Sequence, residues 1–216
     1  MAVIHRTTMT PSKLELLTAW LPTQPWYAGG GEAPELVKAG GFRLDDPEGE
    51  VGIEFMVVTD TSRGRPVTYQ VPLTYRGAPL AGADHALIGT SEHGVLGRRW
   101  IYDGPHDPVL AAQLFALIAG KAVPQAQSES GTPDPTVVGH LAENGPAGAA
   151  DLTGVSNGPD GTDLLMEAMQ RRLTIRIQRR LGPRTADSAL GHVTAEWLLP
   201  DGAKARGLFA VMNEER

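Results

Sequence analysis

The chain contains no cysteine and no long hydrophobic run. The first absence excludes disulfides, thiol catalysis and thiolate-bound metals. The longest apolar-rich stretch, PVLAAQLFALIAG, is too short to span a bilayer and contains Gln113. The N-terminal segment MAVIHRTTMTPSK also lacks the apolar core of a secretory signal. We therefore expect a cytoplasmic protein that has no membrane partner.

Basic residues are also in short supply. The formal net charge is −6, from 19 Lys and Arg against 25 Asp and Glu. Binding to the phosphate backbone of nucleic acid needs a basic excess, so we expect no nucleic-acid partner. By contrast, Gly (26) and Pro (17) are abundant, which favours turns over long helices in these 216 residues.

Two segments have a helical pattern. The segment MTPSKLELLTAWLP predicts a helix with Thr10 as its cap and Pro11 at its first position. The segment HDPVLAAQLFALIAGK predicts a second helix, which Asp107 caps and Gly120 ends. A further helix is compatible with the residues from Leu164 to Gln170.

Alternating apolar residues predict strands elsewhere in the chain. VGIEFMVVTDT and VTYQVPLTYR predict an antiparallel hairpin, and Pro72 places the second strand at an edge or a bulge. HALIGTSEHGVLGRRWIYDG predicts two short strands around a Ser-Glu-His-Gly turn. HVTAEWLLPDGAKARGLFAVM predicts a hairpin closed by Pro200-Asp201-Gly202. The fold class we expect is α+β, a curved and mostly antiparallel sheet packed with a few α-helices. Its expected core contains the helix 107–119 and five aromatic residues: Trp20, Trp26, Phe55, Tyr69 and Trp100.

Motifs of catalysis and metal binding are incomplete. The three glycines Gly29–Gly31 are followed by Glu32, which would repel phosphate, so we interpret them as a connection. GVSNG matches a nucleophile elbow around Ser156 but has no strand–turn–helix context. Ser91, Glu92 and His93 could form a nucleophile, base and orienter, but a solvated turn fits the segment better. We expect no catalytic residue, no cofactor and no metal site, since the histidines lack paired-ligand spacing.

Six arginines and no acid lie between Arg171 and Arg184. On a strand, Arg172, Arg176 and Arg180 would share one face and could bind an anionic ligand or a partner. The alternative is a solvated sheet face or an edge that is protected against aggregation. Both interpretations stay open on the sequence.

The first half of the chain resembles a known family. The motifs are LELLTAWLPTQPWYAGGG, the strands VGIEFMVVTDT and VTYQVPLTYRGAPL, and YDGPHDP opening a helix. They are similar to the N-terminal cap region of actinobacterial maltokinases and related aminosugar kinases, over about residues 11–120. The resemblance implies a cap-like region at 1–120. A Pro/Gly/Ser-rich linker or long loop would follow at 121–162, with one weak strand near Pro135–His140. A β-rich segment at 163–216 would complete the same domain.

The kinase motifs that follow such a cap are not found. A kinase needs a catalytic Asp and a metal-binding Asn in a His-x-Asp-type loop, together with an Asp-Phe-like motif. None of Asn144, Asn157 and Asn213 follows such a loop, and no Asp precedes Phe. The resemblance therefore implies a stand-alone protein that carries the cap without the catalytic lobes, which is not an enzyme.

We expect a non-catalytic binding or regulatory protein of α-glucan, glycogen, trehalose or maltose metabolism. Its expected partner is a kinase or another enzyme of that metabolism, and a homodimer is compatible with the sequence. The alternative is a protein that binds a sugar or sugar phosphate, with Trp26, Tyr27 and Trp100 as candidate contacts, although packing is their simpler role. An enzyme of α-glucan metabolism ranks last, because no pair of catalytic carboxylates stands out.

Overall fold

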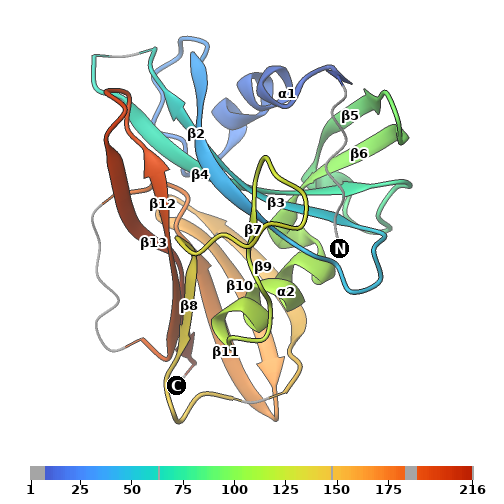
Figure 1. Ribbon diagram of the computed structural model, residues 1–216, viewed down its shortest axis with the longest axis vertical. Coiled ribbons are helices and arrows are strands. Elements are labelled where there is room, and N and C mark those ends of the chain that lie inside the picture. Colours follow the sequence, from blue (N-terminus) through green and yellow to red (C-terminus); the bar gives the residue numbers. More distant parts are fainter. Residues whose placement is uncertain (1–7, 63, 147, 183–188, 216) are drawn as a thin grey trace.

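In the part of the chain that the structure describes, two antiparallel sheets and two α-helices form the fold (Figure 1). The computed structural model describes residues 8–62, 64–146, 148–182 and 189–215. The chain is mostly antiparallel β-sheet, so it lies at the border between the α+β class that we expected and the mostly-β class. In the described part of the chain, no helix has the length and apolar character needed to cross a membrane.

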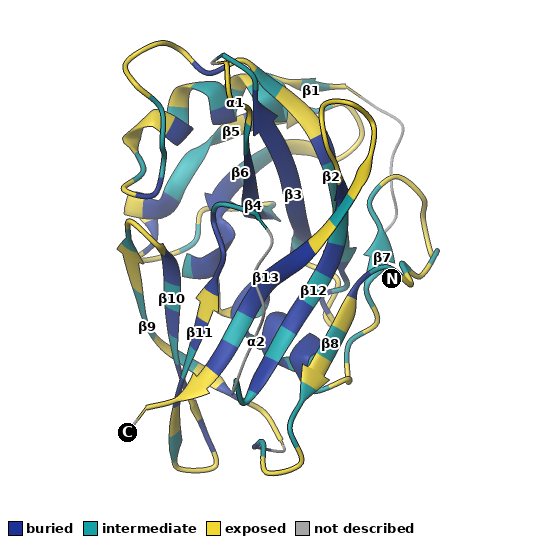
Figure 2. Cartoon of the chain, turned by 90° about the vertical axis from the view of Figure 1, so that its left-hand side faces the viewer, coloured by how far each residue is buried: buried dark blue, intermediate teal, exposed yellow. Residues whose placement is uncertain are grey.

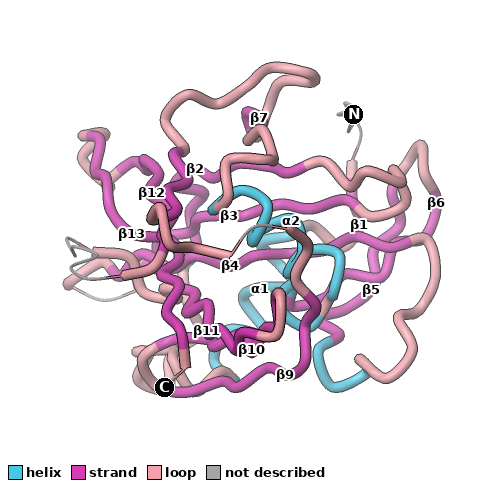
Figure 3. The backbone as a smooth tube through the Cα atoms, turned by 90° about the horizontal axis from the view of Figure 1, so that it is seen from below, coloured by secondary structure: helices cyan, strands magenta, loops and turns pink. Residues whose placement is uncertain are grey.

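Sheet A, as we call the larger sheet, has seven strands and contains both predicted N-terminal strand pairs. In spatial order its strands are β1 (Met9–Thr10), β5 (Leu87–His93), β6 (Gly97–Asp103), β4 (Val67–Arg76), β3 (Gly52–Asp60), β2 (Leu36–Leu44) and β7 (Gln125–Ala126). The predicted hairpin of β3 and β4 is confirmed, with Phe55 opposite Pro72. Seen from below, β7 lies beyond β2 at the margin of the molecule (Figure 3).

Sheet B has six strands, which come from the second half of the chain. In spatial order they are β8 (Val138–Leu141), β12 (Gly191–Leu198), β13 (Lys204–Glu214), β11 (Arg171–Ile177), β10 (Gly161–Ala168) and β9 (Asp151–Gly158). The predicted hairpin of β12 and β13 is confirmed. The helix considered at Leu164–Gln170 is wrong, because these residues form most of β10 and pair with both β9 and β11.

The two faces of sheet A lie in different hydrophobic cores. One face, which we call inner, packs on sheet B and the second helix, and includes Ile53, Phe55 and Val57. The other face, which we call outer, packs on the first helix and includes Met56 and Val58. Because both faces are covered, β3 and β4 are buried along most of their length (Figure 2).

The first helix, α1 (Lys13–Trp20), covers the outer face and continues into the 3-10 turn η1 (Leu21–Thr23). Its N-cap is Ser12 and not Thr10 as predicted. Ser12 and Glu15 form a capping box, in which each side chain accepts a hydrogen bond from the other residue's backbone amide. The Ser-x-x-Glu spacing was therefore a better signal than the proline.

The second helix, α2 (Pro108–Ile118), has the predicted cap and is enclosed by sheet B. It is preceded by the 3-10 turns η2 (Asp84–Ala86) and η3 (Gly104–His106). Both edge strands of sheet B, β8 and β9, contact α2. The sheet therefore curls around the helix as a half-barrel, which agrees with the predicted curvature (Figure 1).

Residues 121–162 are not the structureless linker that their composition suggested. They contain β7, β8 and β9, which belong to both sheets. The expected weak strand is β8, shifted to Val138–Leu141. Gly139 lies so close to the end of α2 that a Cβ atom there would be 1.9 Å from the Leu117 carbonyl oxygen. Small residues in this segment allow such close packing, which explains why it lacks large apolar side chains.

The two sheets are also joined through the backbone beside Pro72. Strand β4 is internal, not at an edge as Pro72 suggested, but β6 pairs with it only from Leu73 onward. Beyond that point, the backbone amide of Gln70 donates to the carbonyl of Arg179, and that of Leu181 donates to Thr68. Pro72 thus lies in the gap between two pairing partners, where the ladder is interrupted.

Candidate functional site

One of the three arginines in the predicted stripe is paired with an acid of a neighbouring strand, and the other two form no ion pair with a described residue. Arg176 forms a bidentate ion pair with Asp163 of β10, with both contacts at 2.7 Å. Arg180 lies past the end of β11, and its side chain donates to the Pro159 carbonyl. Arg172 is exposed and forms no hydrogen bond or ion pair through its side chain with any described residue. Arg184 lies outside the described residues. Binding of a ligand or partner by this stripe stays a prediction.

The three aromatic candidates do not come together in one place. Trp26 is 1% exposed, so it cannot offer a platform to a sugar. Tyr27 is half-buried, and its hydroxyl donates to Asp60 at 2.8 Å. Trp100 is opposite Arg76 in the register of β4 and β6, whereas Trp26 packs against Tyr69 of β4. Tyr69 and residue 76 point to opposite faces of the strand, so Trp26 and Trp100 lie on opposite faces of sheet A.

Ser91, Glu92 and His93 form the end of β5 and not a turn, so alternation sends neighbouring side chains to opposite faces. Ser91 is buried and its hydroxyl donates to the Pro11 carbonyl. Ser156 is exposed on the edge strand β9, which turns directly into β10. Neither serine has the surroundings of a nucleophile.

Histidines meet in two pairs that their spacing did not predict. A ring nitrogen of His85 lies 3.1 Å from one of His106, and the rings of His140 and His192 are 5.1 Å apart. Burial lowers the pKa of His106 and that of His192. Among the described residues, no group of three or more metal-binding side chains exists.

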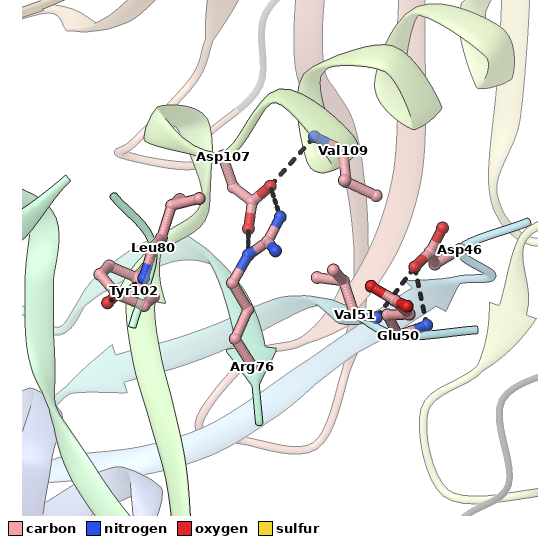
Figure 4. Close-up of polar contacts among 8 residues, drawn as sticks. All are labelled: Asp46, Glu50, Val51, Arg76, Leu80, Tyr102, Asp107 and Val109. Carbon is pink, nitrogen blue, oxygen red and sulfur yellow. Dashed lines mark hydrogen bonds and ion pairs between the residues drawn. The ribbon is translucent and has the colours of Figure 1, made fainter. Parts of the chain in front are cut away.

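Asp107 has a structural role, as the sequence indicated. Its carboxylate accepts the backbone amide of Val109 at 3.0 Å, which caps α2. It also accepts two hydrogen bonds from Arg76, at 2.7 and 2.8 Å, so that the guanidinium ties β4 to the helix (Figure 4). Both carboxylate oxygens are occupied and Asp107 is fully buried. It is therefore not available as a catalytic base.

A different polar cluster lies on the outer face of sheet A, beside the start of α1. We call it the Glu54 cluster, and its members are Lys13, Lys38, Arg43, Glu54, Tyr75 and Gln127. At its centre is Glu54, a carboxylate only 4% exposed. Lys13 donates to its two oxygens at 2.9 and 2.8 Å, Tyr75 donates at 2.5 Å, and Gln127 donates at 2.7 Å. Four hydrogen bonds from three segments thus fix these side chains in place.

Glycine at position 41 makes this arrangement possible. Gly41 has a φ of +131°, and a Cβ there would be 2.3 Å from the Phe55 carbonyl oxygen and 2.9 Å from the Gln127 amide nitrogen. The missing side chain lets Gln127 cross β2 and reach Glu54 on β3. A bulge in β2 adjoins this point, between Lys38 and Gly40.

The electrostatic balance of the cluster is positive. Burial alone would raise the pKa of Glu54, but the charge of Lys13 and the hydrogen bonds outweigh it, and the pKa is lowered. Burial raises the pKa of Tyr75 well above 10.0, and the charge of Glu54 adds to that shift. Glu54 is therefore the carboxylate and Tyr75 the neutral phenol. One negative charge faces three cationic side chains.

Two of those cations are unpaired. Lys38 is opposite Val58, and Arg43 is opposite Glu54, so both belong to the outer face. Neither side chain has a hydrogen bond or ion pair with the part of the chain that the structure describes, and the buried Nε of Arg43 has no partner there. Partial burial lowers the pKa of Lys38, opposed by the charge of Glu54. Burial and the charge of Glu54 raise the pKa of Tyr75, and the charge of Arg43 opposes that shift. The cations thus lie within electrostatic reach of the carboxylate and phenol.

The sequence analysis missed this cluster. One signal was available: Glu54 interrupts the apolar run VGIEFMVV, and an acid in a buried strand requires partners. The partners themselves were not predictable, since Lys13 and Gln127 are 41 and 73 residues away along the chain.

Comparison with known proteins agrees with the resemblance seen in the sequence. Residues 20–107 match the family described as the maltokinase N-terminal cap domain. The match runs from the last residue of α1 to the cap of α2 and includes β2 to β6. No curated protein matches the chain. Lys38, Arg43, Glu54 and Tyr75 lie within the matched region. The chain is therefore a protein with a maltokinase N-terminal cap-like domain.

Proposed function

We propose that this chain is a non-catalytic, cap-like protein that acts by binding, in the metabolism of α-glucans, trehalose or maltose. It would act in the cytoplasm on a kinase or another enzyme of that metabolism. The observation that supports the proposal most is the position of the residues that follow the matched region. They form α2 and sheet B, which pack on the inner face of the cap's own sheet and share its core. A second copy of the chain as partner stays a prediction.

The test uses two purified proteins. Biolayer interferometry would measure whether the chain binds a maltokinase, and a coupled assay would measure the kinase rate with and without the chain. We expect a saturable complex and a changed rate. The same measurements with an aminosugar kinase show whether recognition extends to the related enzymes. If both kinases remain unbound and their rates are unaffected at micromolar concentrations of the chain, this proposal is wrong.

A second candidate function is the binding of a sugar or sugar phosphate. The Glu54 cluster favours it, because ordered donors and unpaired cations lie together on the outer face of sheet A. Phenol and amide groups, here those of Tyr75 and Gln127, can also hydrogen-bond sugar hydroxyls. This function requires no partner protein, so the two candidates can be tested separately.

A further inference from the structure

The Glu54 cluster has an excess of positive charge in a protein whose overall charge is −6. Lys13 is partly committed to Glu54, as an ion pair at 2.8 Å. Lys38 and Arg43 have no such partner among the described residues. Unpaired cations gathered on one face of an acidic protein attract anions locally.

The strand register brings the two free cations toward a common point. Their partners on β3, Val58 and Glu54, are four residues apart, so the two positions are about 13 Å apart along the strand. Gly41 lies between them on the same face and has no side chain. Both long side chains can therefore extend over Gly41 toward the Gln127 amide, which lies close above it.

The character of the three cations fits a phosphate group. Arg43 is half-buried, and its Nε is buried and out of reach of a ligand. Its two Nη atoms are not buried and have no partner among the described residues, so they are available for a planar, two-point contact with phosphate oxygens. Lys38 supplies a flexible point charge. The ammonium group of Lys13 donates to both oxygens of Glu54, and its third N–H can donate to the same phosphate. Tyr75 and Gln127 remain as neutral groups for hydroxyls of the same ligand.

We propose that Lys38 and Arg43 bind the phosphate of a small phosphorylated metabolite, such as a sugar phosphate, on the outer face of sheet A, beside the Gln127 side chain that crosses Gly41. The inference rests on the second candidate function and specifies its ligand class. Glu54 is a positioning residue here, since it holds Lys13, Tyr75 and Gln127 and has no free oxygen.

The test is isothermal titration calorimetry on the full chain at constant ionic strength. The probes are inorganic phosphate, glucose 1-phosphate and maltose. We expect both phosphates to bind, with glucose 1-phosphate tighter, and Lys38→Ala with Arg43→Ala to weaken that binding at least about tenfold. Lys38 is exposed, so Lys38→Ala alone preserves the fold and should weaken binding severalfold. Arg43→Lys keeps the charge but loses the two-point contact, and should give an intermediate affinity.

The matched control is Arg172→Ala, which removes an exposed, unpaired arginine from sheet B. We expect it to leave phosphate binding unchanged. The inference is overturned if neither phosphate binds at millimolar concentration, if the double variant binds as wild type does, or if Arg172→Ala is the variant that loses binding. Maltose binding that survives in the double variant while both phosphates fail to bind overturns the phosphate site but keeps the sugar-binding function. Complex formation with a kinase is measured separately and does not depend on either result.

Discussion

Arg179 and Asp103 form a fully buried ion pair that connects the two sheets. The Nη2 atom of Arg179 is 2.7 Å from both carboxylate oxygens, and its Nε donates to the hydroxyl of Thr162 on β10. The guanidinium carbon lies 4.7 Å from the ring centre of Trp26, which adds a cation–π contact. Asp103 ends β6 of sheet A, and Arg179 follows β11 of sheet B. The pair therefore links the matched cap region to the second half of the chain.

Replacing Asp103 by Asn should lower the free energy of unfolding by about 3–5 kcal/mol, because it leaves the Arg179 charge buried without a counter-charge. Urea unfolding followed by tryptophan fluorescence would measure the change. The matched control is Asp163→Asn, which breaks the partly exposed pair with Arg176 and should cost about 1 kcal/mol or less. Equal losses in the two variants would contradict a linking role for Arg179.

Gly139 tests whether residues 121–162 belong to the folded core. Gly139→Ala would place a methyl group against the Leu117 carbonyl and should destabilise the protein by about 1–3 kcal/mol or more. Gly158→Ala is the control, since a Cβ there meets no atom within 4 Å. That variant should be neutral or slightly stabilising, because alanine restricts the unfolded chain. Thermal melting would compare them, and a harmless Gly139→Ala would support the linker interpretation instead.

Asp107 should stabilise the fold and should have no catalytic role. Asp107→Ala removes the cap of α2 and the counter-charge of Arg76, so we expect a loss of about 3 kcal/mol in urea unfolding. Asp201→Ala removes a carboxylate that accepts the amide of Ala203 in an exposed turn, and should cost less than about 1 kcal/mol. If the two aspartates proved equally dispensable, the structural role of Asp107 would be wrong.

The Glu54 cluster predicts an acid-sensitive stability. The pKa of Glu54 is lower in the folded chain than its ordinary value of 4.5, because its carboxylate form is hydrogen-bonded and paired with Lys13. Glu54 therefore stabilises the fold above about that pH, and this contribution is lost as the pH falls through the lowered pKa. Urea unfolding across the acid range should show a shallower decline for Glu54→Gln than for wild type. Glu92→Gln, which alters an exposed pair, should retain the wild-type slope.

Apolar alternation was sufficient to predict β3, β4 and the β12–β13 hairpin. Strand β12 has the alternating burial that this pattern implies, whereas β3 and β4 are buried on both faces. The segment from Leu164 to Gln170 was ambiguous because Leu, Met, Glu and Ala all favour helices. Pairing with β9 and β11 on both sides decided in favour of a strand there.

The edge strand β9 and the candidate site could not be predicted from the sequence, although the edge strand β8 was expected close to its observed position. Strand β9 consists of small and polar residues, and only Leu152 and Val155 pack on the core, so its alternation is weak. The arginine stripe was visible, but its acidic partners, such as Asp163 for Arg176, come from other strands. In the same way, Glu54 could be noticed from the sequence, whereas Lys13 and Gln127 meet it only after folding.

The proposed function predicts that this chain binds and does not phosphorylate. Phosphorus NMR on the purified chain with ATP, Mg²⁺ and maltose tests it most directly, with a maltokinase as the positive control. We predict that the ATP resonances persist and that no sugar-phosphate signal appears during an incubation in which the control reaction is complete. A growing sugar-phosphate resonance that depends on the chain would contradict the claim.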